Sequence, residues 1–282
     1  MKKYLSLIKF SHTIFAMPFA LIGFFLASQQ YNFEWITLLY VMLCMVFARS
    51  AAMAFNRYID RDIDIANERT AQIREIPNGI ITAKNALLFV VINAILFVLT
   101  TYFINSLCFA LSPIALLIIL GYSYTKRFTV LCHLVLGLGV SLAPIGAYLA
   151  VSGIFDIIPI LFSCVVLFWV SGFDIIYSLQ DEEFDKTQKL HSIPVLLGKK
   201  NALNLVKFLH FVTILLLLQI GNYSEFGKFY WIGFSIFSAL LIYQHTLVKH
   251  NDLNKVNLAF FTTNGIASVI FGAFVIIELL TS

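Results

Sequence analysis

The sequence predicts an all-α membrane protein whose single domain, residues 1–282, crosses the bilayer nine times. First, 60% of the residues are apolar and only 12% are charged, which is far from the balance of a soluble domain. Second, the apolar residues form nine stretches of 18 to 23 residues, and a helix needs about 20 such residues to cross about 30 Å of hydrocarbon. Third, the basic residues are distributed as in a membrane protein of fixed orientation.

The expected membrane helices follow one another along the chain without a Pro, Gly and Ser-rich linker between them. In order, they are Phe10–Ser28, Trp35–Phe55, Ala86–Phe103, Leu107–Tyr124, Val130–Val151, Ile157–Leu179, Leu203–Gly221, Phe229–Val248 and Leu258–Leu280. The first stretch is not interpreted as a signal peptide, because Pro18 interrupts it and no clear cleavage site follows. The four cysteines lie singly in apolar stretches and are expected to be unpaired.

The basic residues predict the orientation of the chain. With nine crossings and alternate loops on opposite sides, Lys228 is the one residue among the 19 Lys and Arg that falls on the side away from the N-terminus. Cytoplasmic loops carry such an excess of positive charge. The N-terminus is therefore expected in the cytoplasm, and the membrane is expected to be a bacterial inner membrane. Orientation accounts for the basic residues, so no nucleic-acid partner is expected.

The second apolar stretch leads directly into the hydrophilic segment NRYIDRDIDIANERT, which starts at Asn56. In this segment, Asn56, Asp60 and Asp64 are spaced by four. Residues four apart lie on one face of a helix, one turn from each other. Stacked carboxylates repel, so this face is costly unless cations neutralise it.

A second hydrophilic segment, YSLQDEEFDKTQKLHSIPVLLGKK, follows the sixth apolar stretch and repeats this pattern. Asp181 and Asp185 are again four apart, and both segments continue through basic residues to a Pro and a Gly. Four crossings separate the segments, so both are expected on the cytoplasmic side. Oxygen ligands without His or Cys suit a hard divalent ion such as Mg²⁺, which uses one or two carboxylates, water and substrate phosphates.

Solvated loops with local charge pairs are the plain alternative for each cluster, but two clusters at equivalent helix ends favour a shared site. The segment YSYTKR, Tyr122 to Arg127, ends the fourth stretch on the same side. Its Lys126 and Arg127 either anchor the helix at the interface or bind phosphate. Basic side chains beside a metal ion are suited to a departing phosphate group.

Two ionisable residues lie inside the apolar stretches, where a charge is expensive and usually functional. Asp174 precedes Asp181 by seven residues and Asp185 by eleven, so it lies on nearly the same helix face. Arg49 has the same spacing from Asn56 and Asp60. Structural pairing of Arg49 with Asp174 and direct contact with a substrate both remain open. His133 is expected to be a packing or interhelical residue.

Together these motifs resemble the UbiA-type intramembrane prenyltransferases, closest to the 4-hydroxybenzoate polyprenyltransferase-like branch. The resemblance rests on NRYIDRDID, YSLQDEEFD, YSYTKR and the N-terminal IKFSHTIFAMPFALIG. It covers essentially the whole chain. It implies nine helices around a central cavity that opens sideways to lipid, under cytoplasmic caps formed by the two hydrophilic segments.

The resemblance also implies Mg²⁺-dependent transfer of a polyprenyl group from polyprenyl diphosphate to an aromatic acceptor, in ubiquinone or menaquinone biosynthesis. The expected metal ligands are Asn56, Asp60, Asp64, Asp181 and Asp185. We expect Asp60, Asp181 and Asp174 to be catalytic. The expected substrate-binding residues are Arg49, Arg69, Arg74, Tyr122, Lys126 and Arg127. Trp169, Phe173 and Tyr177, spaced by four, are candidates to face a carbocation. Tyr177 replaces the Asn of the first motif, so the second ligand set is expected to be smaller.

Other functions remain alternatives at this stage. A protoheme-type or dihydroxynaphthoate-type prenyltransferase would carry similar motifs. A cation-coupled transporter would place its ionisable groups near the bilayer midplane on broken helices, whereas the acidic clusters here lie at one interface. The acceptor, which we expect to be a hydroxyaromatic acid, and the isoprenoid length are not encoded in a recognisable motif.

Overall fold

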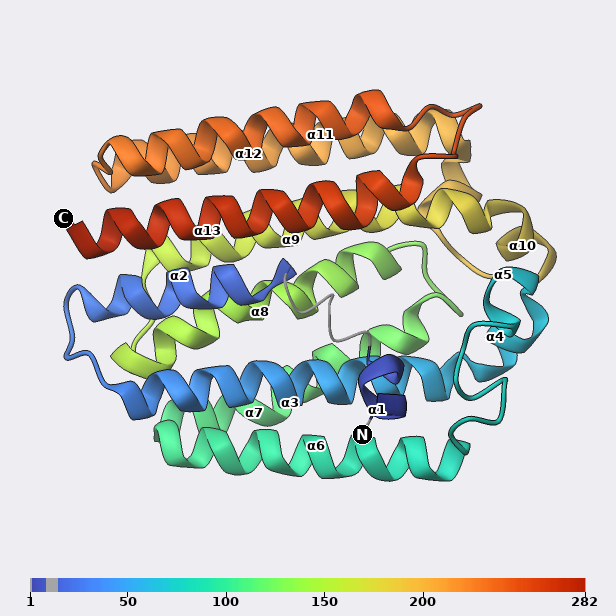
Figure 1. Cartoon of the computed structure of the whole chain (residues 1–282), viewed down its shortest axis with the longest axis horizontal. Coiled ribbons are helices and arrows are strands. Elements are labelled where there is room, and N and C mark those ends of the chain that lie inside the picture. Colours follow the sequence, from blue (N-terminus) through green and yellow to red (C-terminus); the bar gives the residue numbers. More distant parts are fainter. Residues whose placement is uncertain (1, 9–14, 282) are drawn as a thin grey trace. The chain divides into compact units, whose positions relative to one another are not determined.

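In a computed structural model that describes residues 2–8 and 15–281, the described elements are helices joined by turns and loops (Figure 1). Residues 10–14, where the first expected membrane segment begins, lie outside the described part. The helices are α1 (Lys2–Leu7), α2 (Met17–Ser28), α3 (Trp35–Ile59), α4 (Arg61–Ala66), α5 (Glu68–Ala71), α6 (Ala83–Ile104), α7 (Ser106–Thr125), α8 (Cys132–Ser152), α9 (Ile157–Ser178), η2 (Leu179–Asp181), α10 (Glu182–Thr187), α11 (Ile193–Tyr223), α12 (Lys228–Leu247), the π-helical η3 (Leu258–Thr263) and α13 (Asn264–Thr281).

The helices form two compact units. The first unit contains α1 and the helices from α3 to α7, and the second contains α2 and everything from Thr125 onward. In the first unit, α3 packs along α6 and also contacts α1. Its core includes the fully buried Ala51, Ala54 and Ala86 beside Leu7. Small side chains allow membrane helices to approach closely, so these alanines explain the α3–α6 contact.

In the second unit, α8 packs against α2 and α9, while α9 also packs against α11, and α13 against α2 and α12. The core is aromatic, with Phe19, Trp169, Phe237 and Phe271 fully buried. The indole N–H of Trp169 donates to the Asn264 side chain at 2.9 Å. This bond satisfies a polar group that would otherwise be costly in an apolar interior.

Two of the three aromatic residues expected to face a carbocation are enclosed in the core of the second unit. Trp169 and Phe173 pack edge to face at 5.2 Å between ring centroids, and both are buried in the core. Tyr177 is half-buried and packs against Phe260 in a tilted arrangement, with the ring centroids 4.5 Å apart. For Trp169 the sequence interpretation is wrong: spacing by four identified one helix face, but that face is packed against other helices.

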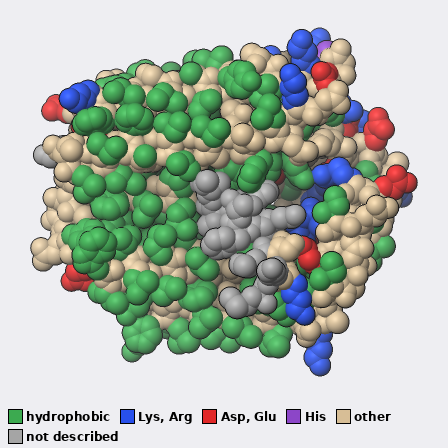
Figure 2. Space-filling model, viewed as in Figure 1, with side chains coloured by type: hydrophobic (Ala, Val, Ile, Leu, Met, Phe, Trp, Pro, Cys, Tyr) green, Lys and Arg blue, Asp and Glu red, His purple; other side chains and the backbone are tan. Residues whose placement is uncertain are grey.

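Seven helices of the described chain are long and apolar enough to cross a membrane: α3, α6, α7, α8, α9 with its extension to Thr187, α11, and η3 with α13. Hydrophobic side chains cover the visible surface of the long helices, and charged side chains gather near helix ends (Figure 2). The protein is an integral membrane protein. The remaining two expected crossings coincide with α12, which has 20 residues, and with α2, whose described part has 12, so nine crossings stay a prediction.

Candidate active site

The first acidic cluster lies where α3 ends and α4 begins. The helix breaks at Asp60, yet the backbone N–H groups of Asp60 and Asp64 still donate to the carbonyls four residues earlier, at 2.9 and 2.7 Å. The Asn56 amide donates to Asp60 Oδ2 at 2.8 Å. The expected stacking of these residues, one turn apart, is therefore confirmed.

Arg74, shortly after the first hydrophilic segment, folds back onto this cluster. Nε of Arg74 lies 3.8 Å from Asp64 Oδ1, and both side chains are largely buried. The Thr70 hydroxyl donates to the Asp64 carbonyl at 3.0 Å and so holds the returning chain in place. Arg74 was expected to bind substrate, and the structure brings it beside an expected metal ligand. Arg69 lies half-buried on the same turn of chain, in α5.

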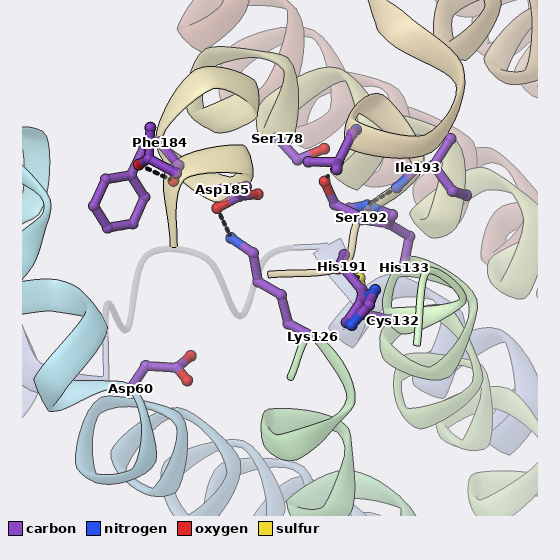
Figure 3. Close-up of polar contacts among 12 residues, drawn as sticks. Asp60, Lys126, Cys132, His133, Ser178, Phe184, Asp185, His191, Ser192 and Ile193 are labelled. Atoms are coloured by element: carbon purple, nitrogen blue, oxygen red, sulfur yellow. Dashed lines mark hydrogen bonds and ion pairs between the residues drawn. The ribbon is translucent and has the colours of Figure 1, made fainter. Parts of the chain in front are cut away.

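The second acidic cluster is more deeply enclosed. Asp181 is buried and Asp185 has no exposed surface. Nζ of Lys126 lies 2.7 Å from Asp185 Oδ1 (Figure 3). The backbone also joins the two segments, because the His191 N–H donates to the Lys126 carbonyl at 2.8 Å. The structure therefore brings Lys126, which follows α7 in the chain, directly to the second acidic motif.

This ion pair sets the charge of the lysine. Burial disfavours the charged form, but the attraction and hydrogen bond of Asp185 outweigh burial and raise the pKa of Lys126 above its ordinary value. Lys126 therefore carries a positive charge at neutral pH, as an anion-binding residue requires. The sequence alternative, in which Lys126 only anchors α7 at the interface, does not account for a contact with a fully buried carboxylate.

Each unit also holds one of the two ionisable side chains that were expected inside the apolar stretches, Arg49 in the first and Asp174 in the second. Asp174 in α9 accepts a 2.6 Å hydrogen bond from His133 in α8, so its carboxylate has a partner within its own unit. The Arg49 Nε in α3 is buried and has no hydrogen-bond acceptor among the described residues. His133 was expected to be a packing or interhelical residue, and the structure shows the interhelical contact; its partner Asp174, 41 residues away, could not be identified from the sequence.

The donor set fits a hard divalent cation. Nothing but carboxylate and amide oxygens is present at the expected ligand positions, as Mg²⁺ prefers. Within the described residues, no three or more His, Cys, Asp and Glu side chains come together as a ready cage. Since Mg²⁺ usually takes only one or two carboxylates and completes its shell with water and phosphate oxygens, each cluster by itself suits such an ion. Tyr122 and Arg127 are half-buried on either side of the α7 end.

Comparisons with known proteins agree with this combination of fold and site. Residues 16–266 match the UbiA prenyltransferase family. The chain is a member of that family. A 4-hydroxybenzoate octaprenyltransferase from Vesicomyosocius okutanii is 32% identical over 251 residues, covering 88% of this chain and 89% of the relative. A protein of the same name from Aeromonas hydrophila is 31% identical over 241 residues, covering 85% and 83%.

Solved structures show the same fold. A UbiA homologue from Aeropyrum pernix superimposes with a TM-score of 0.86 at 29% identity, over 95% of this chain and 98% of the other. A UbiA homologue from Archaeoglobus fulgidus, solved with GPP and Mg²⁺ bound, gives a TM-score of 0.76 at 23% identity, over 99% and 100%. At this identity the second likeness establishes the fold alone.

Proposed function

We propose that the protein transfers a polyprenyl group from polyprenyl diphosphate to a hydroxyaromatic acid in quinone biosynthesis. The bond between the allylic carbon and the diphosphate oxygen breaks, and its electron pair leaves with the diphosphate. A ring carbon of the acceptor bonds to the allylic carbon and releases its proton to a base. The observation that carries this proposal is the charged Lys126 held against the fully buried Asp185 of the second acidic motif, in a chain that belongs to the UbiA prenyltransferase family.

Mg²⁺ is the expected cofactor. Asn56, Asp60 and Asp64 would hold one ion, and Asp181 and Asp185 another. When bound, these ions stabilise the negative charge that develops on the departing diphosphate. Without a cation, the fully buried Asp185 has Lys126 as its nearest opposite charge, so a divalent ion there would relieve an electrostatic cost.

Three basic residues are proposed to bind the donor diphosphate: Arg69, Arg74 and Lys126. Arg74 and Lys126 each contact an acidic residue of one cluster. We propose that they bind the same diphosphate that the metal ions contact. Charge-assisted hydrogen bonds of this kind contribute about 1.5 to 3 kcal/mol each.

Arg49 is the proposed partner of the acceptor carboxylate. Its guanidinium lies about two turns inside α3 from Asn56, and no acidic partner is present among the described residues. A planar guanidinium suits a carboxylate, so an acidic acceptor such as 4-hydroxybenzoate or a dihydroxynaphthoate fits this position. Arg127 is the competing candidate, and Tyr122 is proposed to line the same substrate site.

Asp174 is proposed to contact the acceptor hydroxyl, either orienting it or receiving a proton. Its side chain is 23% exposed, in contrast to the 4% of the histidine that holds it. The carboxylate is therefore accessible from one side. Since water would quench an allylic cation, a site within the bilayer protects the intermediate. We place this site in a cavity open to lipid at the cytoplasmic side of the inner membrane, with the N-terminus in the cytoplasm.

Product analysis with purified protein tests the proposal. The protein in lipid nanodiscs should combine an isoprenoid diphosphate with an aromatic acid to give the acid plus one prenyl group, minus one hydrogen, by mass spectrometry, with one diphosphate released per product. A panel of donors and acceptors, protoheme included, identifies the preferred pair. Cation flux into liposomes with no transfer to any acceptor would instead support the transporter alternative.

A further inference from the structure

The carboxylate of Asp174 is held in place by a histidine from the neighbouring helix. Nδ1 of His133 lies 2.6 Å from Asp174 Oδ2, a short distance for a hydrogen bond to a charged group. The imidazole is enclosed, whereas the carboxylate keeps one accessible side. This contact involves the residue that the proposed function assigns to the acceptor, and it uses only one of the two carboxylate oxygens.

The other side of the imidazole determines which nitrogen carries the proton. The backbone N–H of Ile193 donates to His133 Nε2 at 3.4 Å (Figure 3). If Nε2 accepts from Ile193, that nitrogen has no proton, and the ring is neutral with its proton on Nδ1, pointing to Asp174. In this form of the ring, which the role proposed for His133 requires, the imidazole donates to the carboxylate.

Close packing between α8 and α9 fixes the register that brings these two residues together. A Cβ atom on Gly137, one turn after His133, would lie 2.4 Å from the Ser171 hydroxyl. That hydroxyl donates to the Leu167 carbonyl at 2.7 Å and approaches the His133 carbonyl at 3.2 Å. Ser171 is three residues before Asp174, so the contact locks the two helices beside the pair.

The imidazole also connects Asp174 to the second acidic cluster. Ile193 is the first residue of α11, and Ser192 caps that helix by accepting from the Val195 N–H. The segment from Asp185 to Ser192 joins the acidic cluster to this point. A movement of that segment when the donor binds would therefore reach Asp174 through the Ile193–His133 bond.

We propose that His133 is a positioning residue for prenyl transfer. It donates from Nδ1 to one oxygen of Asp174, keeps the carboxylate ionised, and directs the second oxygen to the hydroxyl of the aromatic acceptor. This inference rests on the proposed function, because it needs an acceptor hydroxyl at Asp174. His133 itself exchanges no proton with substrate.

Substitutions at His133 test the role by separating the two substrates. His133→Leu should lower kcat by about 10-fold to 100-fold, the equivalent of one charge-assisted hydrogen bond, while the KM for the isoprenoid diphosphate changes less than about threefold. His133→Asn keeps an N–H donor near the Nδ1 position and should restore kcat to within about fivefold of wild type. His250→Leu, at an exposed histidine, is the matched control and should have no effect.

A double variant and a spectroscopic measurement complete the test. If His133 acts through Asp174, the variant with both His133→Leu and Asp174→Asn should be no slower than Asp174→Asn alone. Nitrogen-15 NMR of histidine-labelled protein should show a neutral ring protonated at Nδ1, assigned by its loss in His133→Asn. Additive losses, an Nε2-protonated ring, or a raised donor KM with unchanged kcat would each overturn the inference. Absence of transfer by the wild-type protein would refute the proposed function itself, whereas normal transfer by His133→Leu would refute only the role of His133.

Discussion

The two acidic clusters have similar sequences but different surroundings. In the first, a neutral amide, Asn56, donates to Asp60, and Arg74 lies 3.8 Å from Asp64, too far for a hydrogen bond. In the second, Lys126 lies at 2.7 Å from the fully buried Asp185. The two clusters therefore share the spacing of their carboxylates, but these contacts differ in partner and in distance.

This difference has a structural consequence. A buried carboxylate next to a lysine is part of the folded structure even without metal, because removing either partner leaves an uncompensated charge. Asp60 is half-buried and accepts from a side-chain amide. The Arg74–Asp64 contact in its cluster is longer than the Lys126–Asp185 contact. Both clusters are proposed to bind metal, but the closer ion pair of the second is expected to stabilise the protein more.

The largest expected effect is on turnover, and it should be equal in the two clusters. Asp60→Asn and Asp185→Asn should each lower prenyl transfer by on the order of 10² to 10³-fold or more, because each removes charge that holds the diphosphate and its metal. EDTA should abolish transfer by the wild-type protein, and added Mg²⁺ should restore it. Rates are measured by diphosphate release. Full activity in EDTA, or in the double variant, would exclude the metal role.

The second prediction compares how much each cluster's basic partner contributes to the stability of the folded protein. Lys126→Met should destabilise the metal-free protein by about 3 kcal/mol, since it leaves Asp185 buried without its partner. Arg74→Met should cost about 1 kcal/mol or less, because a 3.8 Å contact adds little. Thermal unfolding in detergent with EDTA measures both.

The combined variant Lys126→Met with Asp185→Asn is the control for this comparison. It removes both charges and should be more stable than Lys126→Met alone. Equal destabilisation by Lys126→Met and Arg74→Met would show that the two clusters compensate their charges in the same way after all.

The sequence predicted those features that depend on local pattern. Apolar length located each of the seven described membrane helices, and spacing by four placed Asn56 and Asp60 in contact. Contacts between residues far apart in the sequence were harder to predict. The contact of Lys126 with Asp185 joins residues 59 apart, and it was anticipated only in general terms, through the side of the membrane that both share.

Other features could not be predicted, because they depend on packing between helices. The bond from His133 to Asp174 follows from the α8–α9 register, and the enclosure of Trp169 from its neighbours in the core. The break at Asp60 also carries no Gly or Pro signal, since neither residue is present from Asn56 to Thr70. Periodicity identifies the face of a helix but not what covers it.

The third prediction extends the comparison to the ionisable residues inside the helices. Arg49 precedes the first cluster as Asp174 precedes the second, but only Asp174 has a partner in its own unit among the described residues. If Arg49 binds the acceptor carboxylate, Arg49→Leu should weaken use of the acid by about 10 to 150-fold, equivalent to one charge-assisted bond. The ratio of kcat to KM is measured for the acid and for an analogue without the carboxylate.

The analogue serves as the control for Arg49. It should lose much less than the acid, because it makes no bond to the guanidinium. Equal losses for both compounds would favour a structural role for Arg49. An unchanged preference for the acid would move carboxylate binding to Arg127.

The smallest expected effects concern a feature that both clusters share. Each hydrophilic segment continues to a glycine with positive φ, Gly79 at +68° and Gly198 at +73°. A Cβ at either position would meet no atom within 4 Å, so the cost of alanine there is conformational only. Gly79→Ala should destabilise the protein by about 1 to 2 kcal/mol. Gly198→Ala should cost somewhat more, because its ψ of 161° places it in a region that is almost restricted to glycine.

Gly146→Ala is the matched control for this pair, because Gly146 also has open space around a Cβ but has no positive φ in α8. It should be neutral or stabilise the protein by up to about 1 kcal/mol, since alanine favours helix over glycine. Thermal unfolding measures all three variants, and prenyl transfer at low temperature should stay within about threefold of wild type. A neutral Gly198→Ala would show that the backbone after the second cluster can adopt another conformation without cost. The glycine that follows each acidic segment would then be a coincidence of sequence and not a structural requirement.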